Sequence, residues 1–389
     1  MASGQYRWIL VGALFLVSAL NYADRTSVTS VYALLKTDLG FTDVALGAMG
    51  SLFLWSYALA SPLGGYLGDR VSRGRLIVGS LAGWSLITLL SGLAVAPWQL
   101  LAMRVALGLV EALYIPAAFA LVAEFHGSRT RATALGILIL GNSVGMVGGG
   151  TLAGYLGQQF GWRAPLLFLG VAGLVLALAC RFILPLDNQR PAVEAAPVSF
   201  GKTVMALMRV PSIAVLTVAG LLTSIGGWIF INWLPLYFHE NFGWSLARAG
   251  FLGSSLVSVS AAAALVVAGY LSDRVAQGGA HRRLWMQAIL ILCATPVLLT
   301  FLVTKNQLAV MVALVAYSDL TSTGQRSTVI GLTNMSNTIA GGLGVFAAGA
   351  LKSTVGLDGV FASVAGILAL DAALLFTGCV RFVRRDLKT

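Results

Sequence analysis

Six charged side chains interrupt stretches of this sequence that are otherwise apolar. A charged group at the centre of a membrane-spanning helix costs about 2.5–3.5 kcal/mol on insertion scales, so each one is a candidate for a functional role. Carboxyl groups in such surroundings can take up and release protons, and guanidinium groups can bind anions. The six residues are Asp24, Arg25, Arg104, Glu111, Asp319 and Asp371.

Four of these residues have spacings that place them on helix faces. Asp24 and Arg25 fall in a first helix, well beyond its beginning. Arg104, Gly108 and Glu111 lie at positions i, i+4 and i+7 of a fourth helix, where the glycine lets a neighbour approach closely. These stripes can either do chemistry together or form static ion pairs, Asp24 with Arg25 or Arg104 with Glu111, that only tie helices to one another.

The composition indicates what surrounds these groups. Of 389 residues, 58% are hydrophobic and only 10% are charged, and the mean hydropathy is +0.87. Soluble domains carry about 25% charged residues, so most of this surface faces a bilayer. The apolar runs are about 20 residues long, as membrane helices require, whereas barrel strands need about 9–11 alternating residues. The sequence therefore predicts an all-α integral membrane protein.

Twelve such runs form two groups of six. Residues 1–185 are expected to form one six-helix bundle and residues 205–389 a second, joined by a polar cytoplasmic linker at 186–204. The ninth and tenth runs are short. The predicted helices are 6–36, 44–68, 76–96, 98–125, 132–158, 163–185, 205–238, 246–272, 284–303, 306–324, 327–352 and 358–381.

The basic residues are distributed unequally between the two sides of the membrane. With both termini in the cytoplasm, most of the 25 Lys and Arg residues border cytoplasmic helix ends, which is the positive-inside pattern. Because these residues do not form one patch, the net charge of +11 does not indicate nucleic-acid binding. Outer segments hold Lys36, Arg163, Arg248, Lys305 and Lys352.

The two halves repeat each other at cytoplasmic loops. The stretch Gly65–Arg70 reads GYLGDR, and Gly269–Arg274 reads GYLSDR. A second repeat places an acidic residue seven positions before an arginine in both halves. The predicted cytoplasmic gate charges are Asp69, Arg70, Arg73, Glu124, Arg131, Asp273, Arg274, Asp319 and Arg326.

These motifs resemble those of the major facilitator superfamily over essentially the whole chain. The loop GYLGDRVSRGR is similar to its signature between helices two and three, although Ser72 and Gly74 depart from it. The stretches NYADR, RVALGLVEALYIPAA, WLPLYF and GWSLARAG are similar to the anion:cation symporter branch, which carries sugar acids, sialic acid and glutamate. Spinster-type lipid carriers share the first two patterns, and the third favours organic anions.

The resemblance implies a transporter working by alternating access, with helices one and four lining a central cavity. It assigns proton coupling to Asp24 and Glu111, and we expect Arg25 to bind a substrate carboxylate. Arg104 is expected to be structural or to assist coupling. The other predicted substrate contacts, each of which could instead bond another helix, are Tyr57, Tyr114, Asn142, Asn232 and Asn334.

The expected partners are a small organic anion, protons and the lipid bilayer, with the chain a monomer in the cell membrane. The histidines and cysteines show no metal-ligand or nucleophile–base spacing, so no enzyme, metal or cofactor is expected. Two rival functions remain open, a spinster-like exporter of lysolipids or other amphiphiles and a membrane scaffold that does not transport. Asp371, in the last helix, has no expected role.

Overall fold

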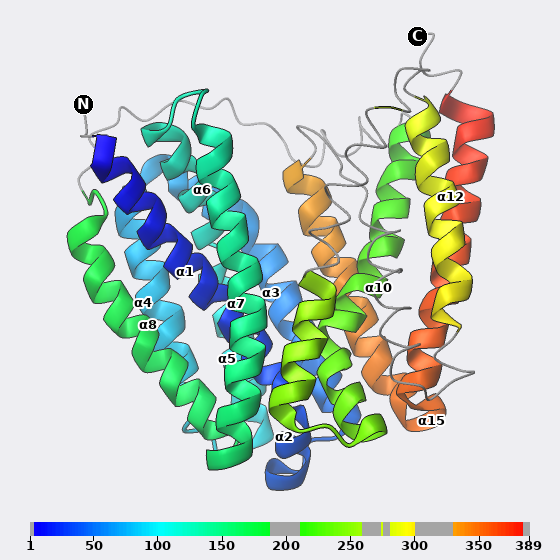
Figure 1. The fold of residues 1–389 in the computed structure, drawn as a ribbon, viewed down its shortest axis with the longest axis horizontal. Coiled ribbons are helices and arrows are strands. Elements are labelled where there is room, and N and C mark those ends of the chain that lie inside the picture. Colours follow the sequence, from blue (N-terminus) through cyan, green and yellow to red (C-terminus); the bar gives the residue numbers. More distant parts are fainter. Residues whose placement is uncertain (1–3, 187–210, 259–273, 275–280, 300–329, 384–389) are drawn as a thin grey trace. The chain divides into compact units, whose positions relative to one another are not determined.

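The computed structural model describes residues 4–186, 211–258, 274, 281–299 and 330–383, and the regular structure in these ranges is helical (Figure 1). The chain divides into two compact units. One comprises Met1–Glu194 with Leu234–Ser254, and the other comprises Ala195–Trp233 with Ser255–Thr389. The predicted all-α fold is confirmed. The domain boundaries in the linker stay a prediction, because residues 187–210 lie outside the described ranges.

The first unit contains the six predicted spans of the N-terminal half. The first and fourth spans are each divided in two, so eight helices account for the six spans. They are α1 (Gly4–Ser30), α2 (Tyr32–Leu39), α3 (Asp43–Arg70), α4 (Arg73–Ser91), α5 (Pro97–Glu111), α6 (Tyr114–Phe125), α7 (Arg131–Phe160) and α8 (Arg163–Ile183).

The division of the fourth span follows from its sequence. Proline has no amide proton, so Pro116 cannot donate to the carbonyl of Ala112, which lies four residues earlier. The turn there tightens, and the amide of Leu113 donates at 3.3 Å to the carbonyl of Val110, three residues earlier, as in a 3₁₀ turn. As a result α5 ends at Glu111 and α6 begins three residues later. The prediction of one continuous helix over 98–125 is therefore wrong at this point.

Glycines bring pairs of helices close together in the first unit. A Cβ atom on Gly145 would lie 1.9 Å from the carbonyl oxygen of Ala19, and one on Gly149 would lie 2.2 Å from the Cα of Ala23. These contacts pack α7 on α1, which lie side by side in Figure 1. At Gly108 of α5, a Cβ would lie 2.5 Å from the backbone of Phe53 in α3. The close approach predicted for Gly108 is therefore confirmed.

The described helices of the second unit are α10 (Pro211–Phe242) as far as Trp233, α12 (His281–Leu298), α15 (Ile330–Gly378) and the π-helical turn η1 (Cys379–Val383). Both α12 and α10 contact α15, the latter through a hydrogen bond from the Nε1 of Trp233 to the Val345 carbonyl at 3.3 Å. In α15 the predicted eleventh and twelfth spans join at Gly356, whose φ of 68° bends the chain between two arms. Residues 246–258 are helical within the predicted eighth span, whereas the predicted tenth span, 306–324, lies outside the described residues.

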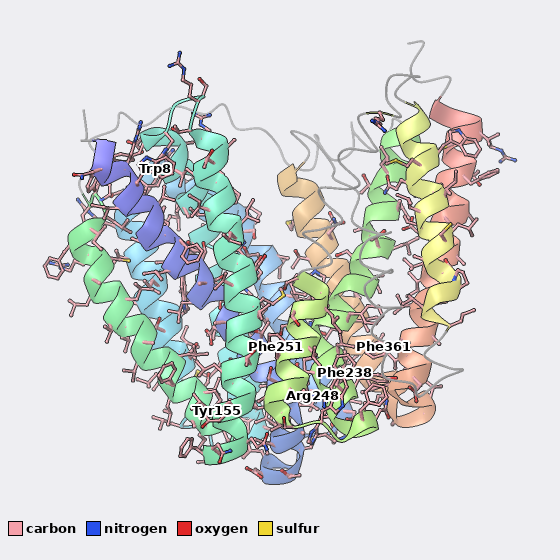
Figure 2. All side chains as sticks on the ribbon, in the orientation of Figure 1. Trp8, Tyr155, Phe238, Arg248, Phe251 and Phe361 are labelled. Atoms are coloured by element: carbon pink, nitrogen blue, oxygen red, sulfur yellow. The ribbon has the colours of Figure 1, made fainter. Side chains whose placement is uncertain are left out.

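Within the described ranges, eight helical segments are long and apolar enough to cross a membrane, and Trp285–Pro296 is a shorter apolar helix. The 47-residue segment Met335–Arg381 covers most of the predicted eleventh span, 327–352, and all of the twelfth, 358–381. In the first unit, exposed aromatic side chains lie near opposite ends, Trp8 on α1 and Tyr155 on α7 (Figure 2). Trp and Tyr favour the two membrane–water interfaces, so this placement is typical of a multi-pass membrane protein.

Candidate functional site

A buried ion pair joins the two polar stripes of the first unit. The Nε of Arg25 on α1 donates to the Oε2 of Glu111 at the end of α5, at 2.9 Å. The Arg25 side chain is 10% exposed and that of Glu111 is 0% exposed. The ion pairs considered as static alternatives, Asp24 with Arg25 and Arg104 with Glu111, are not formed. Instead Arg25 pairs with Glu111 and links the first predicted helix to the fourth.

Three aromatic rings surround the guanidinium of Arg25. Its Cζ lies 4.6 Å from the ring centroid of Tyr57, 4.9 Å from that of Tyr22 and 5.1 Å from that of Phe53. Aromatic faces attract cations, and such contacts are worth more when they are shielded from water. Tyr57 was a predicted substrate residue, and the structure places it against Arg25.

Arg104 is a second buried guanidinium close to the same rings. Its Cζ lies 4.8 Å from the ring centroid of Phe53, so this one ring contacts both arginines. The residue is 4% exposed, and its Nε has no hydrogen-bond partner. None of the ion pairs formed among the described residues involves Arg104.

Asp24 is the second buried carboxyl group of the site. It is 2% exposed, and its Oδ2 accepts a hydrogen bond from the hydroxyl of Thr88 on α4 at 2.5 Å. Its Oδ1 is buried without a hydrogen-bond partner. Arg104 and Arg25 are both near enough to interact with its charge. The site therefore combines two carboxyl and two guanidinium groups, drawn from α1 and α5.

Several polar atoms of this cluster are buried and make no hydrogen bond. A buried polar atom without a partner is costly, so a group of them in one place indicates room for a ligand or a proton. We call Asp24, Arg25, Arg104 and Glu111 the charged cluster. The unpartnered atoms around it are Asn21 Oδ1 and Nδ2, Asp24 Oδ1, Arg25 Nη2, Arg104 Nε and Glu111 Oε1.

The other predicted substrate residues have varied surroundings. Tyr114 is fully buried, and its hydroxyl bonds the Ser18 hydroxyl at 2.7 Å and the Leu14 carbonyl at 3.0 Å, which ties α6 to α1. Asn142 on α7 has a buried Oδ1 without a partner. In the second unit, the amide of Asn232 donates to the Trp228 carbonyl of its own helix at 2.9 Å. Asn334 is helical, and its side chain lies outside the described set.

One ion pair in the first unit joins two of the residues predicted to form the cytoplasmic gate. Arg73 at the start of α4 contacts Glu124 on α6 at 3.3 Å and donates to the Ala120 carbonyl at 2.9 Å. Arg131 donates to carbonyls at the end of α6, including that of Ala123 at 3.1 Å.

The structure describes only some of the remaining predicted gate residues. Arg70 is exposed and stacks on Tyr66, with its Cζ 4.0 Å from the ring centroid. Arg274 is helical and exposed. The side chain of Asp69, and the residues Asp273, Asp319 and Arg326, lie outside the described set.

Sequence reasoning missed three residues of the site, Tyr22, Phe53 and Thr88. Phe53 and Tyr57 are four residues apart, a spacing that places them on one face of α3 and could have paired them. Thr88 was visible only as a polar residue in an apolar run. Among the described residues, no group of three His, Cys, Asp or Glu side chains could hold a metal ion.

Together, the apolar helices and the buried charged cluster are typical of a membrane transport protein. Residues 14–318 match the Major Facilitator Superfamily, so the chain belongs to this family. The predicted family is thereby confirmed.

Similar proteins agree with this assignment. The chain is 28% identical to an "MFS-type efflux pump" of Mycolicibacterium smegmatis, over 96% of this chain and 91% of that protein. It is 29% identical to the "Probable galactarate/D-glucarate transporter GudP" of Bacillus subtilis, over 70% of this chain and 66% of that protein. A bacterial homologue of the human lysosomal transporter Spinster, crystallised inward-facing and unoccupied, has the same fold. Its TM-score is 0.85 at 21% identity, covering 98% of this chain and 99% of that one.

Proposed function

We propose that this protein is a secondary active transporter that moves a small organic anion together with protons. The observation that carries the proposal is the buried contact between Arg25 and Glu111, which leaves Arg25 Nη2 and Glu111 Oε1 without partners. A static structural pair would be stabilised by further hydrogen bonds to those atoms. A pair that must open during each cycle has to leave them available.

The proposed chemistry is an exchange of partners at Arg25. A proton from water adds to the carboxylate of Glu111, which then no longer balances the guanidinium charge. A substrate carboxylate takes its place and accepts N–H bonds from the planar fork of Arg25. The exchange keeps the buried site close to neutral, which lowers the cost of closing it away from water. Asp24, beside Thr88 and Arg104, is the second candidate proton carrier.

The same exchange explains why proton and anion would move together. With Glu111 ionised, Arg25 is already paired and a substrate carboxylate would add an unbalanced negative charge. With Glu111 protonated and no anion bound, Arg25 would be a buried cation without a counter-ion. Both states are costly to occlude, so only the empty deprotonated carrier and the fully loaded carrier would change sides.

The nature of the anion is suggested by the relatives and by the rings around Arg25. The Bacillus subtilis relative is named for galactarate and D-glucarate, which are acids with several hydroxyl groups. Tyr22 and Tyr57 flank Arg25 and bring phenolic hydroxyls that can bond such groups.

Both termini would lie in the cytoplasm and the chain would act as a monomer in the cell membrane. Arg73 and Glu124 would close the cytoplasmic side.

The direct test uses purified protein in liposomes with D-glucarate, galactarate and a panel of monocarboxylic acids. We expect an inward proton gradient to drive accumulation of at least one acid, and a protonophore to abolish accumulation while leaving exchange of labelled for unlabelled acid. Uptake that ignores the proton gradient would contradict proton coupling. Transport of lysophospholipid without any acid would contradict the choice of substrate and favour the exporter function instead.

A further inference from the structure

The second unit contains a buried carboxyl group that the proposed function does not use. Asp371, on the second arm of α15, is 0% exposed. Its Oδ2 accepts a hydrogen bond from the hydroxyl of Thr223 on α10 at 2.7 Å, and its Oδ1 is buried with no partner. The side chain therefore points between helices and not towards lipid.

Charged groups on the neighbouring described elements lie far from Asp371 along their helices. On α15 itself, Asp358 precedes it by about 20 Å of helix, with Lys352 beyond, and Arg381 in η1 follows it by about 15 Å. The part of α10 in the second unit, residues 211–233, contains no charged residue. On α12 the basic residues are His281, Arg282 and Arg283, at the helix start.

The start of α12 is placed by an aromatic contact. Trp285 packs edge-on against Phe376, five residues beyond Asp371 on α15, with ring centroids 4.8 Å apart. None of the ion pairs within the described ranges includes Asp371. The hydrogen-bond partner of Asp371 is the neutral hydroxyl of Thr223.

Among the described residues, a carboxylate in this setting would be a buried charge without a counter-ion, which is far costlier than a neutral acid bonded to threonine. We propose that Asp371 is a second proton-binding site of the transporter, which holds a proton in the conformation described here and releases it during the transport cycle. In the neutral form Oδ1 carries the proton and the Thr223 hydroxyl donates to Oδ2. Release returns the proton to water and leaves the carboxylate.

The link to transport is the helix that carries Thr223. The chain passes from the second compact unit to the first within α10, between Trp233 and Leu234, next to Pro235. A proline inside a helix removes one backbone hydrogen bond and gives a point of bending. If α10 rearranges during the cycle, Asp371 loses its hydroxyl partner, and water that replaces it favours the ionised form. This inference rests on the proposed function, because it assigns part of the proton load to a second site.

The first test does not depend on transport. Infrared difference spectra of purified protein at neutral pH should contain a carboxylic-acid C=O band that disappears in Asp371→Asn and shifts in frequency in Thr223→Val. The band should persist in Asp358→Asn, which removes a carboxyl group near the other end of the same arm. A band that survives in Asp371→Asn, or no band at all, would overturn the proposal. Asparagine has the shape and neutrality of the protonated acid, so the variant is expected to fold.

The second test measures how many protons move with each substrate. Liposomes are loaded with D-glucarate, or with whichever acid the panel identifies. The pH gradient that just balances an opposing substrate gradient gives the ratio of protons to substrate molecules transported. We expect the ratio to fall by about one proton in Asp371→Asn and to be unchanged in Asp358→Asn. An unchanged ratio in Asp371→Asn would overturn the release step. Failure of the wild type to carry any acid would instead refute the proposed function, and the infrared test would still decide the state of Asp371.

Discussion

Arg25 is the residue on which the proposed chemistry converges. It is bonded to Glu111, flanked by three aromatic rings and nearly buried. Contacts with ring faces hold a guanidinium in place, and the Nη2 of Arg25 still has no hydrogen-bond partner and can donate to a carboxylate. This arrangement can fix the cation in place while its anionic partner is exchanged.

Replacing Glu111 with glutamine should separate transport from proton coupling. The amide mimics the protonated acid and cannot release a proton, so we expect accumulation driven by a pH gradient to be lost. Exchange of labelled for unlabelled acid should continue within a few-fold of the wild-type rate. Liposome uptake with and without a gradient measures both. Glu194→Gln, in the predicted linker, is the matched control. Full proton-driven accumulation by Glu111→Gln would remove Glu111 from the coupling role.

Substitution of Arg25 should act mainly on affinity. Hydrogen bonds to charged groups are worth about 1.5–3 kcal/mol, so Arg25→Ala should weaken binding of the acid about 10- to 100-fold. Arg25→Lys keeps the charge but loses the planar fork, and an intermediate effect is expected. Concentration dependence of exchange, or calorimetric titration in detergent, measures the change. Normal affinity in Arg25→Ala would contradict the clamp role.

At the scale of elements, close helix crossings determine where the charged cluster forms. Gly145 and Gly149 of α7 contact the backbone of α1 at Ala19 and Ala23, directly before Asp24 and Arg25 in the chain. Gly108 does the same for α3 and α5, three residues before Glu111. These small residues set the distance between the stripes, since a larger side chain would hold the helices apart.

A larger residue at Gly149 should disturb the site without changing its chemistry. A Cβ there would lie 2.2 Å from the Cα of Ala23, so Gly149→Val should shift α1 and cost about 1–3 kcal/mol or more. We expect a lower thermal denaturation midpoint in detergent and a loss of uptake. Gly148→Ala is the control, because a Cβ at Gly148 meets nothing within 4 Å. Equal stability of the two variants would show that the crossing is looser than described.

At the scale of the whole molecule, the distribution of basic residues sets the orientation in the membrane. Lys and Arg are retained on the cytoplasmic side during insertion, and most of the 25 border one set of helix ends. We expect both termini to be cytoplasmic. Reporter fusions to each terminus, one active only in the cytoplasm and one only outside it, test the orientation. A terminus that reports from outside would contradict the proposal that the Arg73–Glu124 ion pair lies on the cytoplasmic side of the membrane.

The sequence allowed much of the architecture to be predicted, because membrane helices are specified locally. A run of about 20 apolar residues forms a helix whatever surrounds it, since its backbone has no other partner in lipid. The six spans of the first unit accordingly appear near their expected bounds. The break at Glu111 was not foreseen, although Pro116 was visible in the sequence. Asp371, in the final span, had no expected role, and its complete burial was not foreseen.

The sequence by itself determined the membrane class, the family, the helix spans of the first unit and the short set of charged residues that could do chemistry. These follow from composition, from the length of apolar runs and from spacings within single helices. Only the tertiary structure decided that Arg25 pairs with Glu111, that Phe53 contacts both arginines and that Thr88 bonds Asp24. Those contacts join different helices, and the helix rotations and crossing distances that create them depend on packing against the rest of the unit.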